Sequence, residues 1–424
     1  LAAPATSGTF NILSFNVAGL PAILNSNDVP GDKTTNTETI GQKFSTYNFS
    51  IIHVQEDFNY HATLYANDNH PYRTATSGGV PFGDGLNTLS NFDWIDFERT
   101  KWATCSDTSG SDCLTPKGFT FMRVRVSEGV WVDAYNLHAD AGTEPNDITA
   151  RASNLAQVST HISQYSTGNA VLVFGDSNSR YTRSGDIPSI FSSQNGMTDA
   201  WVQLARSGSA PAAGSGALLC DNPSNTTACE IVDKVWYRGG PALQLNATKF
   251  QYAGSMFLQS DGNVLSDHNP VLVDVSWKTS STLRMSDFFG GPHGDYFNDI
   301  TALSTISSPS VASITLRGAN RLDALSITLS SGQALSHGGT GGTANTLNLD
   351  GGEKLVQATV CQGKYNDTTR IFYMQVISSL GRIVTAGKMT SECVVRTVED
   401  GWGIVGFVGR DGDEIDRVGF VYGK

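Results

Sequence analysis

The sequence predicts an α/β module followed by an all-β module, and three observations carry this prediction. Strand-like and helix-like stretches alternate over residues 1–278, whereas short β runs separated by glycines fill residues 285–424. The segment 279–284 between them is short and polar, as linkers are. The length of 424 residues also favours two domains, because single hydrophobic cores seldom grow beyond roughly 250–300 residues.

The first module contains runs with the period-two alternation or the continuous apolar character of sheet strands. These runs are residues 10–17, 51–55, 131–138 and 170–174. Between the last two, residues 147–164 place Ile148, Leu155 and Ile162 at the spacing of an amphipathic helix. Strands that alternate with helices indicate an α/β layered domain.

The second module has no long helical pattern, and its apolar residues fall in short runs with glycine between them. The clearest runs are residues 313–316, 324–329, 370–376 and 403–408. Short strands with regular glycine turns are typical of an all-β module.

The composition excludes several classes of protein. Twenty-eight Lys and Arg against 40 Asp and Glu give a formal charge of −12, which disfavours nonspecific binding to nucleic acid or anionic membranes without excluding a nuclease. Hydrophobic residues make up 39%, enough for packed cores, and no apolar run approaches the ~20 residues of a membrane-spanning helix. Residues 1–4, without a methionine or an apolar leader, predict a mature form whose signal peptide has been removed.

Six cysteines and four N-x-S/T sequons predict a secreted protein. The simplest interpretation of the cysteines is three disulfides: Cys105–Cys113, Cys220–Cys229 and Cys361–Cys393. Free buried thiols are the alternative for some of them. The sequons predict glycosylation at Asn48, Asn225, Asn246 and Asn366.

Polar residues stand after, within or just before the strand-like runs of the first module, and the ends of strands are where α/β folds keep their sites. They are Asn16, Glu56, His138, Asp176, Asn178, Asp233, Asp267 and His268. Each alone has an ordinary structural alternative, such as an aspartate that caps a helix. Together they offer oxygen and imidazole groups, which suit Mg²⁺ or Mn²⁺ and acid–base chemistry at a phosphoryl centre. The sequence contains no P-loop, zincin or serine-hydrolase motif.

The motifs around these residues resemble the endonuclease/exonuclease/phosphatase superfamily over nearly all of residues 10–277. The most specific are Gly-Asp-Ser-Asn at 175–178 and Ser-Asp-His-Asn-Pro-Val at 266–271. The resemblance implies a four-layer α/β/β/α sandwich and metal-dependent hydrolysis of phosphate esters. It assigns Mg²⁺, with Mn²⁺ or another divalent cation as the alternative, to Asn16, Glu56 and Asp267.

The same resemblance implies catalytic roles for five residues. Asp176 would orient or deprotonate the attacking water, and Asn178 would hydrogen-bond a phosphate oxygen. His268 would stabilise charge on the phosphoryl oxygens, with Asp233 fixing its ring and keeping it cationic. His138 would lie opposite, as a second phosphate contact or an acid.

Three further stretches, residues 84–90, 113–119 and 151–157, are similar to the sphingomyelinase-like branch of this superfamily. The sequence shows no long aromatic hairpin of the kind with which bacterial sphingomyelinases enter membranes. The choice between a phospholipid and a nucleic acid as substrate therefore stays open.

The all-β module resembles the jacalin-related lectins, which are β-prisms of three small sheets. The stretches that carry the resemblance are residues 290–299, 337–342 and 409–420. It implies a monosaccharide site at Gly291, Gly412 and Asp416. Asp413 and Glu414 stand where the family often has aromatic residues, so the stacking on a sugar face would be lost. A β-prism that only stabilises or spaces the enzyme is the alternative.

Taken together, the sequence predicts a secreted, monomeric Mg²⁺-dependent phosphodiesterase, most simply a sphingomyelinase- or phospholipase C-like enzyme with a carbohydrate-binding-type module. Its expected partners are a phosphodiester substrate, a glycan and, peripherally, a membrane surface. Two alternatives stay open: a secreted deoxyribonuclease I-like endonuclease, and a glycan-binding protein whose phosphoesterase site is vestigial.

Overall fold

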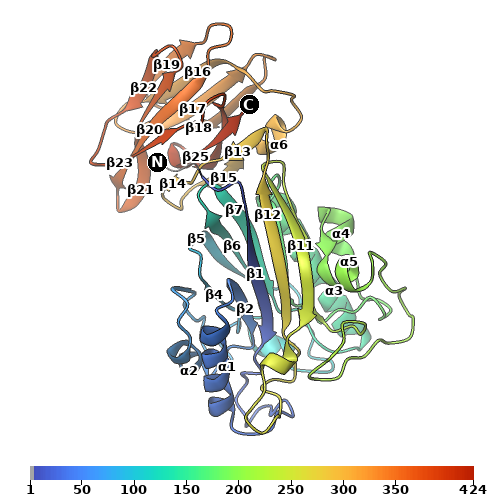
Figure 1. Ribbon diagram of the computed structural model, residues 1–424. Coiled ribbons are helices and arrows are strands. Elements are labelled where there is room, and N and C mark those ends of the chain that lie inside the picture. The colour runs from blue at the N-terminus through green and yellow to red at the C-terminus, as the bar shows by residue number, and fades with distance from the viewer. Residues whose placement is uncertain (1–3) are drawn as a thin grey trace.

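The computed structural model describes residues 4–424. Residues 1–3, part of the predicted start of the mature protein, lie outside the described residues. Figure 1 shows an N-terminal module with strands β1–β12 and a C-terminal module with strands β13–β25, joined end to end. The chain leaves the first set of sheets at Thr279 and enters the second at Leu283. Among the described residues, no helix is long and apolar enough to cross a membrane.

Two six-stranded sheets form the centre of the N-terminal module within residues 4–424, with the orders β11-β12-β1-β2-β4-β3 and β5-β6-β7-β8-β10-β9. The first sheet consists of β1 (Ser7–Asn16), β2 (Ile51–Gln55), β3 (Tyr72–Arg73), β4 (Asn87–Ser90), β11 (Leu243–Tyr252) and β12 (Val271–Thr279). The second consists of β5 (Trp94–Lys101), β6 (Gly118–Ser127), β7 (Val130–Leu137), β8 (Ala170–Asp176), β9 (Thr198–Asp199) and β10 (Asp233–Arg238).

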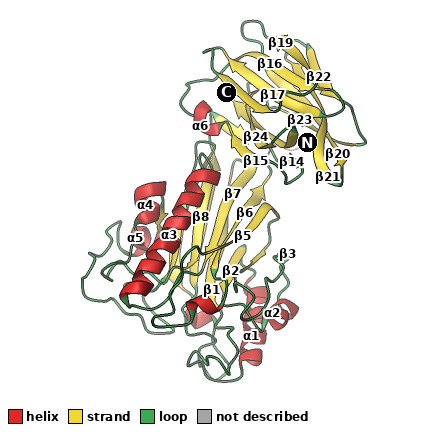
Figure 2. Ribbon diagram, turned by 180° about the vertical axis from the view of Figure 1, so that it is seen from behind, coloured by secondary structure: helices red, strands yellow, loops and turns green. Residues whose placement is uncertain are grey.

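Helices cover the outer faces of the two sheets (Figure 2). The first sheet carries α1 (Lys33–Tyr47) and α2 (His61–Asn67), and the second carries α3 (Pro145–Tyr165) and α4 (Ile190–Asn195). The remaining helical segments of this module are α5 (Ala200–Ala205) and the 3₁₀ turns at Asp112–Leu114 and Gly254–Met256. The predicted α/β/β/α sandwich is confirmed.

The alternation along β1 explains the layering. Phe10 and Ile12 belong to the apolar cluster between the sheets, which the second sheet joins through residues such as Leu172. Leu13 and Phe15 point to the other face and pack in the cluster with α1. Side chains that alternate with period two therefore serve two cores at once.

The C-terminal module consists of three antiparallel sheets within the described residues. The first contains β13 (Leu283–Met285), β14 (Phe289–Gly290), β15 (Asp295–Asn298), β24 (Gly403–Asp411) and β25 (Ile415–Gly423). The second contains β16 (Val311–Gly318), β17 (Leu322–Leu329), β18 (Ala334–Gly338) and β19 (Thr343–Asn348), and the third β20 (Leu355–Tyr365), β21 (Thr368–Ser378), β22 (Ile383–Gly387) and β23 (Glu392–Thr397). Leu316, Val360 and Phe420, one from each sheet, belong to a single hydrophobic core, which confirms the predicted β-prism. Within the described part of this module, the one α-helix is the short α6 (Ile300–Leu303).

All six cysteines are paired, as predicted. Cys105–Cys113 closes the loop before β6, and Cys220–Cys229 closes the loop before β10. Cys361–Cys393 joins the neighbouring strands β20 and β23. The described residues contain no free cysteine.

The junction between the modules is built around the buried carboxylate of Asp96, which lies at an irregularity of β5. Arg410 and Arg417 of the C-terminal module donate to Asp96 Oδ1 over 3.0 and 2.6 Å, and Arg123 of β6 donates to Oδ2 over 3.1 Å. Burial alone would raise the pKa of Asp96, but the three guanidinium groups outweigh it and hold that pKa below its usual value.

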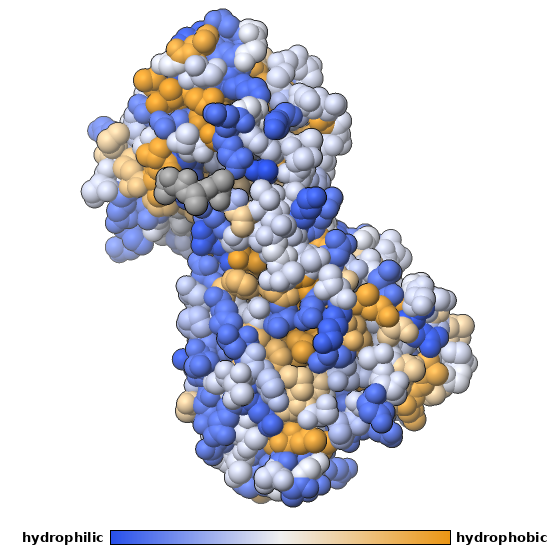
Figure 3. All heavy atoms as spheres, viewed as in Figure 1, coloured by the Kyte–Doolittle hydropathy of each residue, from blue (hydrophilic) through white to orange (hydrophobic). Residues whose placement is uncertain are grey.

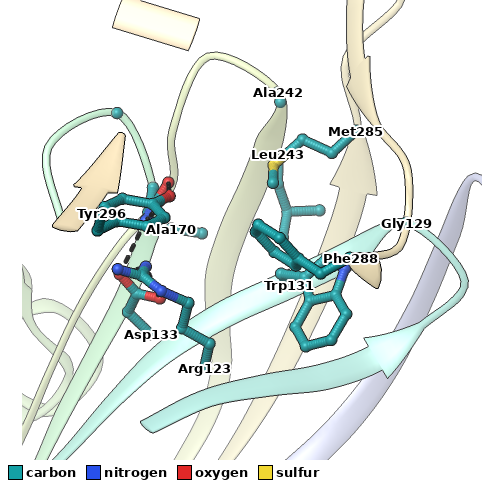
Figure 4. Close-up of a pocket in the computed structure, with 12 residues that line it drawn as sticks. Arg123, Gly129, Trp131, Asp133, Ala170, Ala242, Leu243, Met285, Phe288 and Tyr296 are labelled. Atoms are coloured by element: carbon teal, nitrogen blue, oxygen red, sulfur yellow. Dashed lines mark hydrogen bonds and ion pairs between the residues drawn. The ribbon is translucent and has the colours of Figure 1, made fainter. Parts of the chain in front are cut away.

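A small pocket beside this cluster shows how the two modules interlock (Figure 4). The Tyr296 ring of the C-terminal module stacks on the Arg123 guanidinium, 3.6 Å from the ring centroid, while Arg123 Nη1 donates to both carboxylate oxygens of Asp133. On the other side of the pocket, Trp131 and Phe288 meet edge to face with ring centroids 5.0 Å apart. Aromatic, cationic and carboxylate groups thus fix the orientation of the two modules together.

Asp96→Asn tests the junction. The variant keeps the shape of the side chain but leaves three largely buried guanidinium groups short of one negative charge, so we expect a loss of about 2–4 kcal/mol in unfolding free energy. We also expect faster tryptic cleavage at Lys278, just before the linker, and at Arg284, its last residue. Asp93→Asn, which changes a carboxylate directly before β5, is the control. Equal stability and cleavage in the two variants would contradict the role of Asp96.

His53 of β2 is a buried neutral histidine between the sheets. Its Nδ1 lies 3.1 Å from the Phe174 carbonyl oxygen, to which it donates, and its ring stacks on Phe174 at a centroid distance of 3.6 Å. Burial lowers the pKa of His53 to about 3, with the Phe174 carbonyl opposing the shift. The unfolded chain, with an ordinary histidine pKa of about 6.5, binds the proton first as the pH falls.

The stability contributed by neutral His53 is therefore present above pH ~6.5 and is lost as the pH falls toward ~3. Between pH ~7 and pH ~4.5, this single group should cost about 2–3 kcal/mol of unfolding free energy. Urea unfolding of the protein and of His53→Gln at both pH values measures it. The variant should lose less stability on acidification by that amount, and an equal loss in both would refute the assignment.

Candidate active site

The predicted site residues meet at one end of the N-terminal module, far from the junction. β1 pairs in parallel with β2, and β7 with β8, so the carboxyl ends of each pair lie together. Because the two sheets pack face to face, the ends of both pairs also face each other. Figure 1 shows β1 running from the junction toward this opposite end.

Asn16 connects the two sheets. Its Nδ2 donates to Glu56 Oε1 over 3.1 Å and to Asp176 Oδ2 over 3.2 Å, while its Oδ1 accepts from the Ala18 amide. In this arrangement Asn16 presents its amide nitrogen to the carboxylates and its oxygen to the backbone. Asn16 therefore positions Glu56 and Asp176 here, and its assignment as a cation ligand stays a prediction.

Glu56 has the features expected of a cation ligand. Its backbone adopts the left-handed conformation with φ 56°, which is costly for a residue with a long side chain. Its Oε2 is buried and has no hydrogen-bond partner within the described chain. Burial raises the pKa of Glu56, and Lys117 opposes the shift. A buried carboxylate oxygen without a partner is costly unless a ligand satisfies it.

His268 forms a charged triad with Asp233 and Asp176. Its Nδ1 donates to Asp233 Oδ2 over 2.8 Å, and its Nε2 lies 3.9 Å from Asp176 Oδ2. Burial alone would lower the pKa of His268, but Asp233 and Asp176 outweigh it and raise that pKa well above its ordinary value. One carboxylate oxygen of Asp176, one of Asp233 and a ring nitrogen of His268 lie within 4.8 Å of one another, close enough to bind one metal ion together.

Asp176 is the central carboxylate of the site. Burial and the neighbouring Asp233 raise the pKa of Asp176, against the opposing effect of His268. The Asn178 amide donates to Asp176 Oδ1 over 3.0 Å, and one of the Asn178 side-chain N–H groups donates to the Ala139 carbonyl. A carboxylate with a raised pKa is a better proton acceptor near neutral pH.

His138 faces the same carboxylate from the end of β7, with Nε2 3.4 Å from Asp176 Oδ2. Burial, Lys117 and His268 lower the pKa of His138 well below its ordinary value, so the ring is neutral. The Lys117 ammonium lies 3.2 Å from His138 Nε2 and forms an ion pair with Asp112. The site thus contains one neutral and one cationic histidine.

Lys117 is a site residue that the sequence motifs include only as part of the stretch 113–119. It directly precedes β6, which is antiparallel to β7, so the start of β6 lies beside His138 at the end of β7. This pairing is known from the structure, and no local sequence pattern indicated it. Lys117 adds a fixed positive charge where His138 is neutral.

Asp267 is exposed and stands at the mouth of the site. Its Oδ2 accepts from Asn27 Nδ2 over 3.1 Å, and its charge raises the pKa of Glu56. The charge of Asp267 thus acts on Glu56, and both residues offer carboxylate oxygens, the donor type that Mg²⁺ and Mn²⁺ prefer. The residues present fit a hard divalent cation at this point.

The predicted sugar loop has a different environment. The Asp416 carboxylate is buried and forms an ion pair with Arg370, and Arg321 forms one with Glu414. The Gly291 amide donates to the Asp416 carbonyl over 2.8 Å. Gly412 is exposed at the tip of the loop. Gly291, Gly412 and Asp416 thus lie in one region of the C-terminal module. The Asp416 carboxylate, which was predicted to bind the sugar, is paired with Arg370.

The four sequon asparagines all lie on the surface. They are Asn48, Asn225, Asn246 and Asn366. Exposure is what glycosylation requires, and the modification itself stays a prediction.

Comparison with known proteins places both modules. The model of endonuclease/exonuclease/phosphatase family 2 matches residues 31–222, and the model of the jacalin-like lectin domain matches residues 286–421. The C-terminal module belongs to the jacalin-like lectin family, and residues 31–222 are similar to endonuclease/exonuclease/phosphatase family 2. We therefore call residues that carry β1–β12 the phosphatase-family module, and those that carry β13–β25 the lectin module.

Two curated relatives match one module each. A sphingomyelinase from Mycobacterium tuberculosis is 38% identical over 274 residues, which cover 63% of this chain and 52% of that protein. Horcolin from Hordeum vulgare is 31% identical over 116 residues, 26% of this chain and 80% of that protein. The chain thus spans about half the length of the sphingomyelinases that it matches.

Among solved structures, sphingomyelinase C from Streptomyces griseocarneus is similar to the chain at a TM-score of 0.44 and 16% identity. The match covers 63% of this chain and 99% of that one.

Glu56→Gln should weaken cation binding at the site. The amide keeps the shape of Glu56 but removes the negative charge, so we expect the affinity for Mn²⁺ to fall at least ~10-fold. Titration followed by electron paramagnetic resonance measures free Mn²⁺ directly, without turnover. Asp261→Asn, an exposed carboxylate that bonds only to Asn263 among the described side chains, is the control. Unchanged affinity in Glu56→Gln would remove Glu56 from the cation site.

Proposed function

We propose that the phosphatase-family module is a divalent-cation-dependent phosphodiesterase that acts on a phospholipid such as sphingomyelin. The observation that carries this proposal is the cross-sheet cluster of Asn16, Glu56, Asp176 and His268, which is complete in this chain. The identity of 38% to a sphingomyelinase over 274 residues supports the same substrate class.

In this proposal each residue of the cluster has one task. Asp176, whose pKa is raised, accepts a proton from the attacking water. Cationic His268, held by Asp233, stabilises negative charge on the phosphoryl oxygens, and Asn178 donates to one of them. Lys117 shares the phosphate-binding task that the sequence analysis assigned to His138, because His138 is neutral and Lys117 is charged.

The cation would be held by Glu56 and Asp267, with Mg²⁺ or Mn²⁺ as the ions that suit oxygen donors. When bound, it neutralises the phosphodiester and favours departure of the leaving oxygen. Asn16 keeps Glu56 and Asp176 in place across the two sheets.

We further propose that the protein acts outside the cell, with the lectin module binding a glycan. Three disulfides among the described residues suit an oxidising compartment. The jacalin family match supports a carbohydrate ligand. The ion pair between Arg370 and Asp416 would have to open before a neutral sugar could use that carboxylate.

The substrate test compares sphingomyelin liposomes with duplex DNA, each in Mg²⁺ and with an EDTA control. We expect phosphocholine release that EDTA abolishes, and no nicking of DNA. Nicking without lipid turnover would replace the proposal with a deoxyribonuclease I-like activity. Glycan binding without any cation-dependent turnover would instead favour a vestigial site.

His268→Gln tests the electrostatic role within the active enzyme. The loss of a cationic donor aimed at the phosphoryl oxygens should lower kcat by about 10²-fold or more. Steady-state kinetics on sphingomyelin measures it, and circular dichroism checks that the fold is kept. A change of less than a few-fold would move this role to another residue.

A further inference from the structure

Three large apolar side chains are exposed to solvent on two loops of the phosphatase-family module. Ile23, Leu24 and Phe82 are 93%, 57% and 81% exposed. Ile23 and Leu24 belong to the loop between β1, which ends at Asn16, and α1. Phe82 belongs to the loop between β3 and β4. We call these three side chains the apolar rim.

Both loops pack against the segment 56–59, which begins with Glu56. The Asn59 amide donates to the Gly19 carbonyl over 3.2 Å, and the Asp57 amide donates to the Gly85 carbonyl over 2.9 Å. Gly19 approaches so closely that a Cβ there would lie 2.2 Å from the Glu56 carbonyl oxygen. The apolar rim is therefore attached to the backbone that positions Glu56.

The first loop is held so that its tip faces outward. The Lys33 ammonium at the start of α1 donates to the carbonyls of Ala18, Leu20 and Asn25 over 2.8–2.9 Å, and to Asn27 Oδ1 over 2.7 Å. One buried cation thus fixes the loop on both sides of Ile23 and Leu24. Their exposure is a property of the fixed loop and not of a free chain end.

The second loop is held in a similar way. Arg99 donates to both carboxylate oxygens of Asp84 over 2.8 and 2.9 Å, and Ser77 donates to Asp84 Oδ1 over 2.7 Å. The hydrogen bond between Ser77 and Asp84 joins the two ends of this stretch, and Phe82 lies between them. Two independently tied loops present apolar side chains beside one site.

The charge of the two loops is unusual for this protein. Residues 17–27 and 74–83 contain no Asp, Glu, Lys or Arg, although the whole chain carries −12. An apolar tip without charge avoids the cost of bringing ions into a hydrocarbon region. The acidic chain would be repelled by an anionic surface, so the matching surface is zwitterionic.

The end of the molecule that carries the rim is also free of the lectin module. Figure 3 shows hydrophobic residues at the lower end of the phosphatase-family module, opposite the lectin module. Leu114, just before Lys117, and Leu219, just before Cys220, are also exposed on loops of this module. The Asn222 side chain donates to the Ser266 carbonyl, which ties the second of these loops to the His268 segment.

We propose that the apolar rim docks on a bilayer of zwitterionic lipids and brings the site to the headgroup region. This inference rests on the proposed lipid phosphodiesterase function. It adds a surface that binds the lipid bilayer, separate from the active site that binds one lipid molecule. It also explains how the chain reaches lipid without a long aromatic hairpin, since the turn 259–263 that precedes Ser266 is polar. The rim does not take part in the chemical step.

The test measures vesicle binding and soluble turnover in parallel. Phosphatidylcholine–sphingomyelin vesicles are floated with the protein in EDTA, so that no turnover is required. The variants are Ile23→Ser/Leu24→Ser and Phe82→Ser. The control is Leu380→Ser/Ile383→Ser, which removes side chains of 63% and 54% exposure from the lectin module. Turnover of p-nitrophenyl phosphocholine in Mg²⁺ reports the site without a bilayer.

We expect each apolar side chain to contribute about tenfold to vesicle partitioning, so the double variant should bind about 10²-fold more weakly. The control should bind like the original protein, and all variants should hydrolyse the soluble diester within about twofold of it. Circular dichroism checks the fold of each variant. Turnover on vesicles should fall in parallel with binding.

Three results would overturn the proposal. One is vesicle binding that the rim variants leave unchanged, and another is an equal loss in the control. The third is a dimer of the original protein that the rim variants dissolve in light scattering, since the rim would then join two copies of the chain. Rim-dependent vesicle binding without turnover of any phosphocholine diester would support the rim while refuting the proposed function.

Discussion

The face-to-face packing of two six-stranded sheets is the interaction on which the rest of the phosphatase-family module depends. The apolar cluster between the sheets combines residues of β1, β2 and β12 with residues of β6, β7 and β8. Polar ties cross the same interface at its end, where Gln55 Nε2 donates to Asn136 Oδ1 over 2.8 Å and Asn16 Nδ2 donates to Asp176 Oδ2 over 3.2 Å. Hydrophobic packing supplies the driving force, and these ties set the register in which the two halves of the site meet.

Periodicity made the central strands predictable, because β1, β2, β7 and β8 alternate or are continuously apolar. The expected run 51–55 has the same bounds as β2. Helix α1 was not predicted, since its sequence is rich in Thr and buries only Ile40 and Phe44 among large apolar side chains. Its signal was local: Asp32 caps it by accepting from the Thr35 amide. A short amphipathic stripe with a cap is weaker in sequence than a strand that is buried on both faces.

The residue set of the site was predictable as a set, because its members lie at or near strand ends: Asn16 and Asp176 end strands that pair in parallel, and Asp233 begins β10. Their orientations were not. The amide of Asn16 turns its nitrogen to the carboxylates, Lys117 takes a place next to His138, and Arg370 occupies the carboxylate of Asp416. Each of these contacts joins elements distant in the chain, and side-chain direction there depends on tertiary packing that no local pattern encodes.

The position of the two modules has a consequence for how they cooperate. β1 begins beside β12 near the junction, with Ser7 opposite Lys278, and ends at Asn16, so the site and the lectin module are separated by a ten-residue strand, or roughly 30 Å. At the junction Asp96 accepts hydrogen bonds from three arginines, two of which belong to the lectin module, so the two modules are tied to each other. A rigid bivalent molecule gains effective concentration only at ligand pairs whose spacing matches its own. If the lectin module binds a glycan and the site acts on lipid, glycan binding would raise the local concentration of the site only at lipids that lie about the length of β1 from that glycan. The length of β1 would then set the distance between the glycan and the bilayer at which both modules can bind together.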